Sequence, residues 1–109
     1  MKNFSKDIRL SLRNDLNKLS VFLSVRCYNC DAFIALSIPQ IRGFWPSLML
    51  LLQKIDVQVI NATVSNCANN SFHCIHVKIP ASSDIDSDDL ESLLGAFIVQ
   101  ELGVIPCKD

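Results

Sequence analysis

The sequence predicts a single small α+β domain, built on an antiparallel sheet that carries helices on one of its faces. The chain has 109 residues, which is the length of one domain. Half of its residues are hydrophobic and 19% are charged, a balance typical of a packed core rather than of disorder. Short runs that alternate apolar and polar residues predict strands, and runs with apolar residues at helical spacing interrupt them.

The N-terminal stretch, residues 2–19, is predicted to be an amphipathic helix. Its apolar residues recur at spacings of four and three and form one stripe: Phe4, Ile8, Leu12, Leu16 and Leu19. Leu10 falls off that stripe. Residues 1–20 are therefore expected to be a helix or linker that precedes a domain at 21–109.

Two strands are expected next, at residues 22–28 and 32–38, with a turn between them at 29–31. Pro39 ends the second strand because it cannot donate to the ladder. The alternation in this strand separates Ile34, Leu36 and Ile38 from Phe33, Ala35 and Ser37, which share the opposite face.

A helix and a strand pair are expected to follow. Pro46 suits the first turn of a helix, where its missing N–H has no cost. The helix would face the sheet with Leu48, Leu51, Leu52 and Ile55. The pattern after it predicts a strand at 57–64, an Asn-rich hairpin loop at 66–71 and a return strand at 72–79.

The last helix is expected to begin at Ser87, whose hydroxyl can cap free N–H groups, with Asp88 and Asp89 placed favourably against the helix dipole. Gly103 is a natural stop, and a short strand at 104–105 can follow it. The inward face of this helix would comprise Leu90, Leu93, Leu94, Phe97 and Ile98.

The predicted order is helix, then β–β–α–β–β–α and a short final strand. Its central βαββα part is a split βαβ, ferredoxin-like arrangement. Two helices would cover one face of the sheet, so something else must cover the other face. The N-terminal helix and a second copy of the domain are the two candidates.

Charge and composition exclude some classes of function. The net charge of −1 gives no overall field that would recruit nucleic acid, and the basic residues of the first 26 positions are expected to form a solvated helix face. No signal-like or membrane-spanning segment is visible, so an intracellular protein with reduced thiols and no membrane contact is expected.

The sequence offers few groups with the spacing that chemistry requires. Cys27 and Cys30 form a C-x-x-C on a predicted strand and turn, whereas a redox site would place it at a helix N-terminus. A zinc site could draw on Cys67, Cys74, His73 and His76, but the two histidines should point to opposite faces of their strand. His73 and His76 have no nucleophile or orienting carboxylate nearby in sequence. No enzyme activity, catalytic residue, metal or cofactor is therefore predicted.

Residues 42–65 resemble the core of an ACT-like domain, most closely the one at the C-terminus of plant basic helix-loop-helix (bHLH) transcription factors. The family shows a strand, a loop with a glycine, a leucine-rich helix and a strand of the form Leu-x-Val-x-x-Ala-x-Val/Ile-Ser. The matching positions here are Gly43, Leu48, Leu51, Leu52, Ile55, Val57, Val59, Ala62 and Ser65. The resemblance covers about residues 22–100, and Asp56 stands where many relatives have glycine.

The resemblance implies a dimerisation domain that pairs with itself or with a related bHLH or ACT-like protein and so modulates transcription in the nucleus. Residues 1–21 hold neither a basic region nor a helix-loop-helix, so no direct DNA contact is expected from this chain alone. The alternative implied by metabolic ACT domains is an amino-acid sensor, although no small molecule is expected under the first hypothesis.

The residues predicted for each hypothesis differ. Periodicity places five residues off the face under the helices, and these are the predicted dimer contacts: Phe33, Ala35, Trp45, Met49 and Leu50. The alternative ligand site lies around the glycine loop and comprises Gln40, Arg42, Gly43 and Phe44. Trp45, the only tryptophan, can equally serve as an interface anchor or as a plug of the core.

Overall fold

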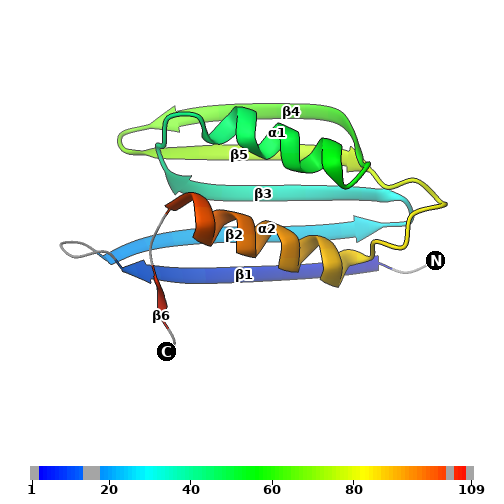
Figure 1. The fold of residues 1–109 in the computed structure, drawn as a ribbon, viewed down its shortest axis with the longest axis horizontal. Helices are drawn as coiled ribbons and strands as arrows, with labels where there is room; N and C mark the ends of the chain where they lie inside the picture. The colour runs from blue at the N-terminus through cyan, green and yellow to red at the C-terminus, as the bar shows by residue number, and fades with distance from the viewer. Residues whose placement is uncertain (1–2, 14–17, 103–104, 108–109) are drawn as a thin grey trace.

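The computed structural model describes residues 3–13, 18–102 and 105–107 (Figure 1). Its elements, in chain order, are β1 (Asn3–Arg13), β2 (Lys18–Tyr28), β3 (Asp31–Pro39), α1 (Phe44–Lys54), β4 (Gln58–Cys67), β5 (Asn70–Lys78), α2 (Ser87–Leu102) and β6 (Ile105–Cys107). The structure is thus an α+β fold, as predicted.

The strands form one antiparallel sheet in the order β4-β5-β3-β2-β1-β6. β3 and β5 lie in its interior, and β4 forms one edge. Both helices lie on the same face of this sheet (Figure 1). From β2 to α2 the order of elements agrees with the predicted β–β–α–β–β–α, with β3, β4 and β5 at the expected places.

The predicted N-terminal helix at residues 2–19 is wrong. Residues 3–13 form β1, which pairs with β2 in continuous register from Asn3↔Tyr28 to Arg13↔Lys18. The spacing of four between Phe4, Ile8 and Leu12 fits a strand of period two as well as a helix, and Leu10 fits only the strand. The leucine that lay off the predicted helical stripe was therefore the informative residue.

The predicted boundary between residues 20 and 21 is also wrong, because it falls inside β2. A β-hairpin instead extends the sheet beyond β3, and β6 pairs with β1 on its far side. An N-terminal helix therefore does not cover the second face of the sheet, which was one of the two predicted solutions.

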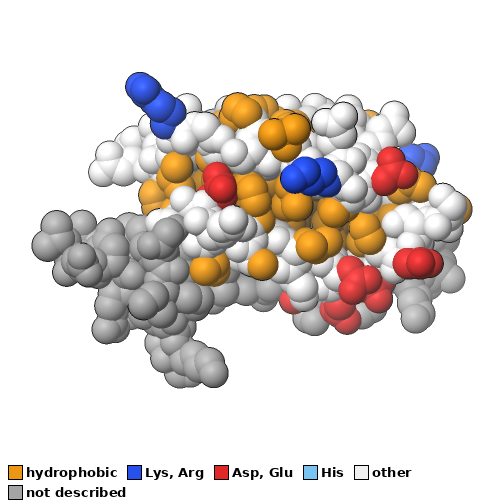
Figure 2. Space-filling view, viewed as in Figure 1, with side chains coloured by type: hydrophobic (Ala, Val, Ile, Leu, Met, Phe, Trp, Pro, Cys, Tyr) orange, Lys and Arg blue, Asp and Glu red, His pale blue; other side chains and the backbone are white. Residues whose placement is uncertain are grey.

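The core lies between the sheet and the two helices. α1 contributes three buried residues, Phe44, Leu48 and Leu52, and α2 contributes Leu90, Leu94 and Ile98. The sheet contributes alternate positions, as the period of two requires. These are Val21, Leu23, Val25, Ala32, Ile34, Leu36, Ile38, Ile75 and Val77. Hydrophobic side chains fill the space between the helices when the molecule is viewed from that side (Figure 2).

α1 begins two residues earlier than its proline. Gly43 stands at the N-cap with φ 80°, in the left-handed region that glycine adopts without steric penalty. Pro46 lies in the first turn, as expected from its missing N–H. Asp56, just beyond the helix, also adopts a positive φ of 63°, which aspartate tolerates better than most residues.

The cap of α2 lies one residue before the predicted Ser87. Asp86 Oδ1 accepts a hydrogen bond from the backbone N–H of Asp89 (2.9 Å), and Asp89 Oδ2 accepts one from the N–H of Asp86 (3.2 Å). The two aspartates therefore satisfy free N–H groups reciprocally, as in a capping box. The predicted stop at Gly103 lies outside the described residues.

Candidate interaction surface on the open sheet face

The face of the sheet opposite the helices carries no other element among the described residues (Figure 1). We call it the open face. The strand registers arrange its side chains in rows that run across the strands. One row, which we call the ridge, contains Asn61, His76, Phe33 and Arg26. The next row, which we call the trough, contains Thr63, Cys74, Ala35 and Ser24.

Two stacked rings form the centre of the ridge. The rings of Phe33 and His76 lie 4.4 Å apart between centroids, at an interplanar angle of 18°. His76 Nε2 is 2.9 Å from Asp31 Oδ1 at the end of β3. Because the imidazole is held on both sides, the ridge is ordered before any partner binds.

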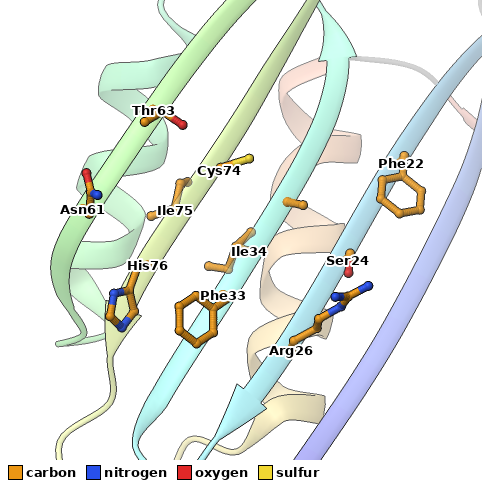
Figure 3. A pocket seen from close by; sticks show the side chains of 11 residues that line it. Phe22, Ser24, Arg26, Phe33, Ile34, Asn61, Thr63, Cys74, Ile75 and His76 are labelled. Carbon is orange, nitrogen blue, oxygen red and sulfur yellow. The ribbon is translucent and has the colours of Figure 1, made fainter.

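Small side chains form the trough, which leaves a hollow of about 490 Å³ between neighbouring rows (Figure 3). Phe33 and Arg26 line one side of the hollow and Phe22 lines the other. Successive rows are two residues apart along each strand, about 7 Å. The open face thus has a raised aromatic row beside a depression of similar extent.

Exposed aromatic residues extend beyond these two rows. Phe33 is 47% exposed, and Phe72 and Tyr28 are each 46% exposed. Phe72 pairs with Ser37 in the row beyond the trough, opposite Phe22. Soluble monomers rarely leave several large aromatic side chains in the open on one face, so this surface is the principal candidate for contact with a partner.

The structure divides the five predicted dimer contacts among three places. Phe33 and Ala35 lie together on the open face, in the ridge and the trough. Trp45 and Met49 are half-buried on α1 and pack against the core. Leu50, which is 58% exposed, lies on the outer surface of the same helix. These residues therefore do not form one continuous patch.

A second hollow, of about 440 Å³, lies beside the glycine loop and includes part of the alternative ligand site. Gln40, Arg42 and Phe44 line it, together with Trp45 and His73. Gln40 is already engaged, because its Nε2 donates to the carbonyl of Ala68 (2.9 Å) and its backbone N–H donates to that of Asn69 (2.8 Å). Gly43 contributes the left-handed turn at the start of α1 rather than a wall of this hollow.

His73 is the unusual group of this second hollow. It is buried on the helix side of β5, and neither ring nitrogen has a hydrogen-bond partner among the described residues. Its ring stacks on Trp45 (centroids 5.5 Å apart, 15°) and lies near Phe44. Burial lowers the pKa of His73, because the charged imidazolium would lose its hydration.

His76 lies on the opposite face from His73, as the alternation predicted. The sequence offered no orienting carboxylate near His76 along the chain, and the β3–β5 pairing instead brings Asp31, 45 residues away in sequence, into contact with it. No local sequence signal could reveal this pair.

The cysteines of the described residues are free thiols: Cys27, Cys30, Cys67 and Cys74. Burial, and after it the charge of Asp86, raises the pKa of Cys27, which is opposite to the shift that a reactive thiolate requires. Within residues 3–13, 18–102 and 105–107, no group of three or more His, Cys, Asp or Glu residues is placed to hold a metal ion.

No known protein family, curated protein or solved structure matches this chain. Among the described helices, none is long and apolar enough to cross a membrane.

Proposed function

We propose that the chain is a protein dimerisation module, and that two copies pair through the open face. The observation that carries this proposal is the ridge of Phe33 and His76 beside the trough of small residues. In a two-fold dimer, each contact of one copy is repeated by the other. If the ridge of one copy lies in the trough of its partner, the symmetry also places the ridge of the partner in the trough of the first copy.

Several properties of the surface support this pairing. Phe33 is nearly half exposed and Ala35 follows on the same side of β3, so a protrusion and a depression lie side by side. Interdigitated rows are the usual means by which two sheets pack, about 10 Å apart. Desolvation of aromatic side chains at the centre of an interface typically contributes most of its binding energy.

The test is sedimentation equilibrium across a dilution series. Phe33→Asp should shift the protein to lower mass, because it replaces the aromatic ring of the ridge with a charged group that would lose its hydration in the partner's trough. Leu93→Asp places the same group at an exposed position on α2, at 37% exposure, and should leave the mass unchanged. An unaltered mass for Phe33→Asp would refute pairing through this face.

Thiol protection gives a second readout that needs no substitution. Cys74 lies exposed in the trough, whereas Cys30 lies half-buried in the turn between β2 and β3, outside the ridge and the trough. Labelling followed by peptide mass spectrometry should show that Cys74 reacts more slowly as protein concentration rises, while Cys30 keeps a constant rate. Equal rates at all concentrations would contradict the proposed contact.

We further propose, on the resemblance of residues 42–65 to ACT-like domains, that this ferredoxin-like domain modulates bHLH-type transcription factors in the nucleus. The glycine loop, the leucine-rich α1 and the strand after it carry that resemblance. The test is subunit exchange, in which the purified chain is mixed with a bHLH factor that has its own ACT-like domain. Mixed dimers in native mass spectrometry, lost with Phe33→Asp, would support the proposal; only self-pairs would refute it.

A second candidate function, a small-molecule sensor, is favoured by the hollow beside Arg42, Trp45 and His73. Arg42 offers a guanidinium suited to a carboxylate, and Trp45 offers an aromatic wall. Calorimetry with each of the twenty amino acids tests it. Saturable heat that Arg42→Ala abolishes would support the sensor, and no heat across the panel would exclude amino acids as ligands.

A further inference from the structure

Cys74 and His76 place a thiol and an imidazole next to each other on the open face. They are two positions apart on β5 and therefore point to the same side of the sheet, where both line the same hollow (Figure 3). The thiol of Cys74 is free and exposed, and the side chain of His76 is 29% exposed. Thiolate sulfur and imidazole nitrogen are the ligands that zinc most often takes in structural sites.

Asp31 prepares His76 for such a role. The carboxylate Oδ1 of Asp31 lies 2.9 Å from Nε2 of His76. A carboxylate only accepts hydrogen bonds, so Nε2 carries the proton of the neutral ring and Nδ1 keeps its lone pair. Histidines that bind a metal usually donate their other N–H to a carboxylate or carbonyl, which fixes the ring. The stacked ring of Phe33 holds the imidazole further.

One copy of the chain supplies only two of the four ligands of a structural zinc site. Within residues 3–13, 18–102 and 105–107, no group of three or more His, Cys, Asp or Glu residues is placed to hold a metal ion. His73, the other histidine of β5, is buried on the helix side and cannot join the pair. Further ligands must therefore come from outside this chain.

The symmetry of the open-face dimer brings a second pair to the first. The ridge of each copy lies in the trough of the other only if the two-fold axis runs along the rows, between ridge and trough. His76 belongs to the ridge and Cys74 to the trough. The axis therefore crosses β5 between these two residues, and the same two residues of the second copy face them across it.

We propose that two copies bind one zinc ion between their open faces, through Cys74 and His76 of each copy. This inference rests on the proposed open-face dimer. The four ligands form a Cys₂His₂ set, which holds zinc tetrahedrally with bonds of about 2.0–2.3 Å. Bonds of this length require the two sheets to lie closer at this point than the usual spacing of about 10 Å, and the small side chains of the trough allow that approach.

Metal titration of the reduced, metal-free protein tests the site. Calorimetry with zinc chloride should show one ion for every two chains. Cobalt chloride should give the absorption bands of tetrahedral cobalt bound to thiolate. Cys74→Ser and His76→Asn should each weaken zinc binding by at least about ten-fold, and Asp31→Asn by about 10- to 100-fold. Cys30→Ser alters a thiol outside the ridge and the trough and should change neither affinity nor stoichiometry.

Sedimentation equilibrium with zinc and with EDTA separates this inference from the dimer itself. A dimer that binds no zinc would overturn the metal site and leave the dimer standing. A chain that stays monomeric under both conditions would overturn both. One zinc ion per chain, or full affinity in Cys74→Ser, would place the ligands elsewhere and so refute the shared site.

Phe33→Asp tests whether the second copy completes the site. This variant keeps Cys74 and His76 but disrupts the dimer, so its affinity for zinc should fall at least ten-fold; unchanged affinity would refute the shared site. Circular dichroism checks the fold of each variant. Where a variant misfolds, the stoichiometry and the cobalt spectrum of the wild-type protein still decide, because a ratio other than one ion to two chains contradicts the proposal.

Discussion

Trp45 and His73 stack nearly parallel, with ring centroids 5.5 Å apart, although one begins α1 and the other lies on β5. The imidazole is 3% exposed, and its nitrogens have no partner among the described residues. His73 therefore behaves as a flat aromatic spacer between helix and sheet, in its neutral form.

This arrangement predicts a pH dependence of stability. The pKa of His73 is lowered in the folded state, so the unfolded chain takes up the proton first as pH falls below about 6.5. The free energy of unfolding should decrease from that pH downward, until the folded-state pKa is passed. His73→Phe should remove this component, because phenylalanine does not titrate.

Denaturant titrations between pH 7 and pH 5 measure the effect. The wild-type curve should fall more steeply with decreasing pH than that of His73→Phe. His76→Phe removes an imidazole from the open face and is the matched control. Identical slopes for wild type and His73→Phe would show that the burial of His73 does not affect its proton binding.

Gly43 should not tolerate a side chain, for reasons of backbone conformation alone. A Cβ at this position would meet no atom within 4 Å, yet φ is +80°. Gly43→Ala should therefore lower the free energy of unfolding by about 1–2 kcal/mol. Gly43→Asn should lose less, because asparagine adopts the left-handed region more readily. Equal stability of the alanine variant and wild type in urea titrations would contradict the assigned conformation.

At Gly95 the same change, from glycine to alanine, should raise the free energy of unfolding instead of lowering it. It lies inside α2, and an added Cβ would again meet nothing within 4 Å. Glycine inside a helix lowers stability by about 0.5–1 kcal/mol relative to alanine, so Gly95→Ala should raise the free energy of unfolding by that amount. Thermal unfolding of the two alanine variants side by side provides the comparison, and a loss of stability at position 95 would refute the prediction.

The cap of α2 should depend on Asp86 more than on its acidic neighbours. Asp86→Ala removes the acceptor for the Asp89 N–H and should cost about 0.5–2 kcal/mol. Asp84→Ala, an exposed change in the same acidic stretch, should cost little. Urea titrations of the two variants give the comparison, and equal losses would mean that general charge, rather than the cap, stabilises this helix end.

Local pattern was sufficient to predict the elements from β2 to α2, because their turns and caps use local chemistry. Pro39 ends β3, Pro46 lies in the first turn of α1, and the Asn-rich loop turns between β4 and β5. The N-terminal assignment failed because a spacing of four satisfies both helical and strand periods. Pairing with β2, a tertiary interaction, decides that residues 3–13 form a strand.

The candidate surface was predicted only in part. Alternation alone placed Phe33 and Ala35 together on one face of β3, since side-chain direction in a strand follows directly from position. Register between distant strands decided the rest: it brings His76 onto Phe33 and Asp31 onto His76. On α1, Leu50 is exposed, whereas Trp45 and Met49 pack against the core. Helical periodicity carries no information on which strand lies beneath the helix.

The sequence by itself determined an α+β domain. It also determined which residues of β3 share a face, that α1 begins after a glycine and that α2 begins with acidic residues. Those features depend on residues within a few positions of one another. Only the tertiary structure decided that the N-terminal segment joins the sheet, that β4 is left at its edge, and that one face stays open. Strand order and register join residues far apart in sequence, and no local period encodes them.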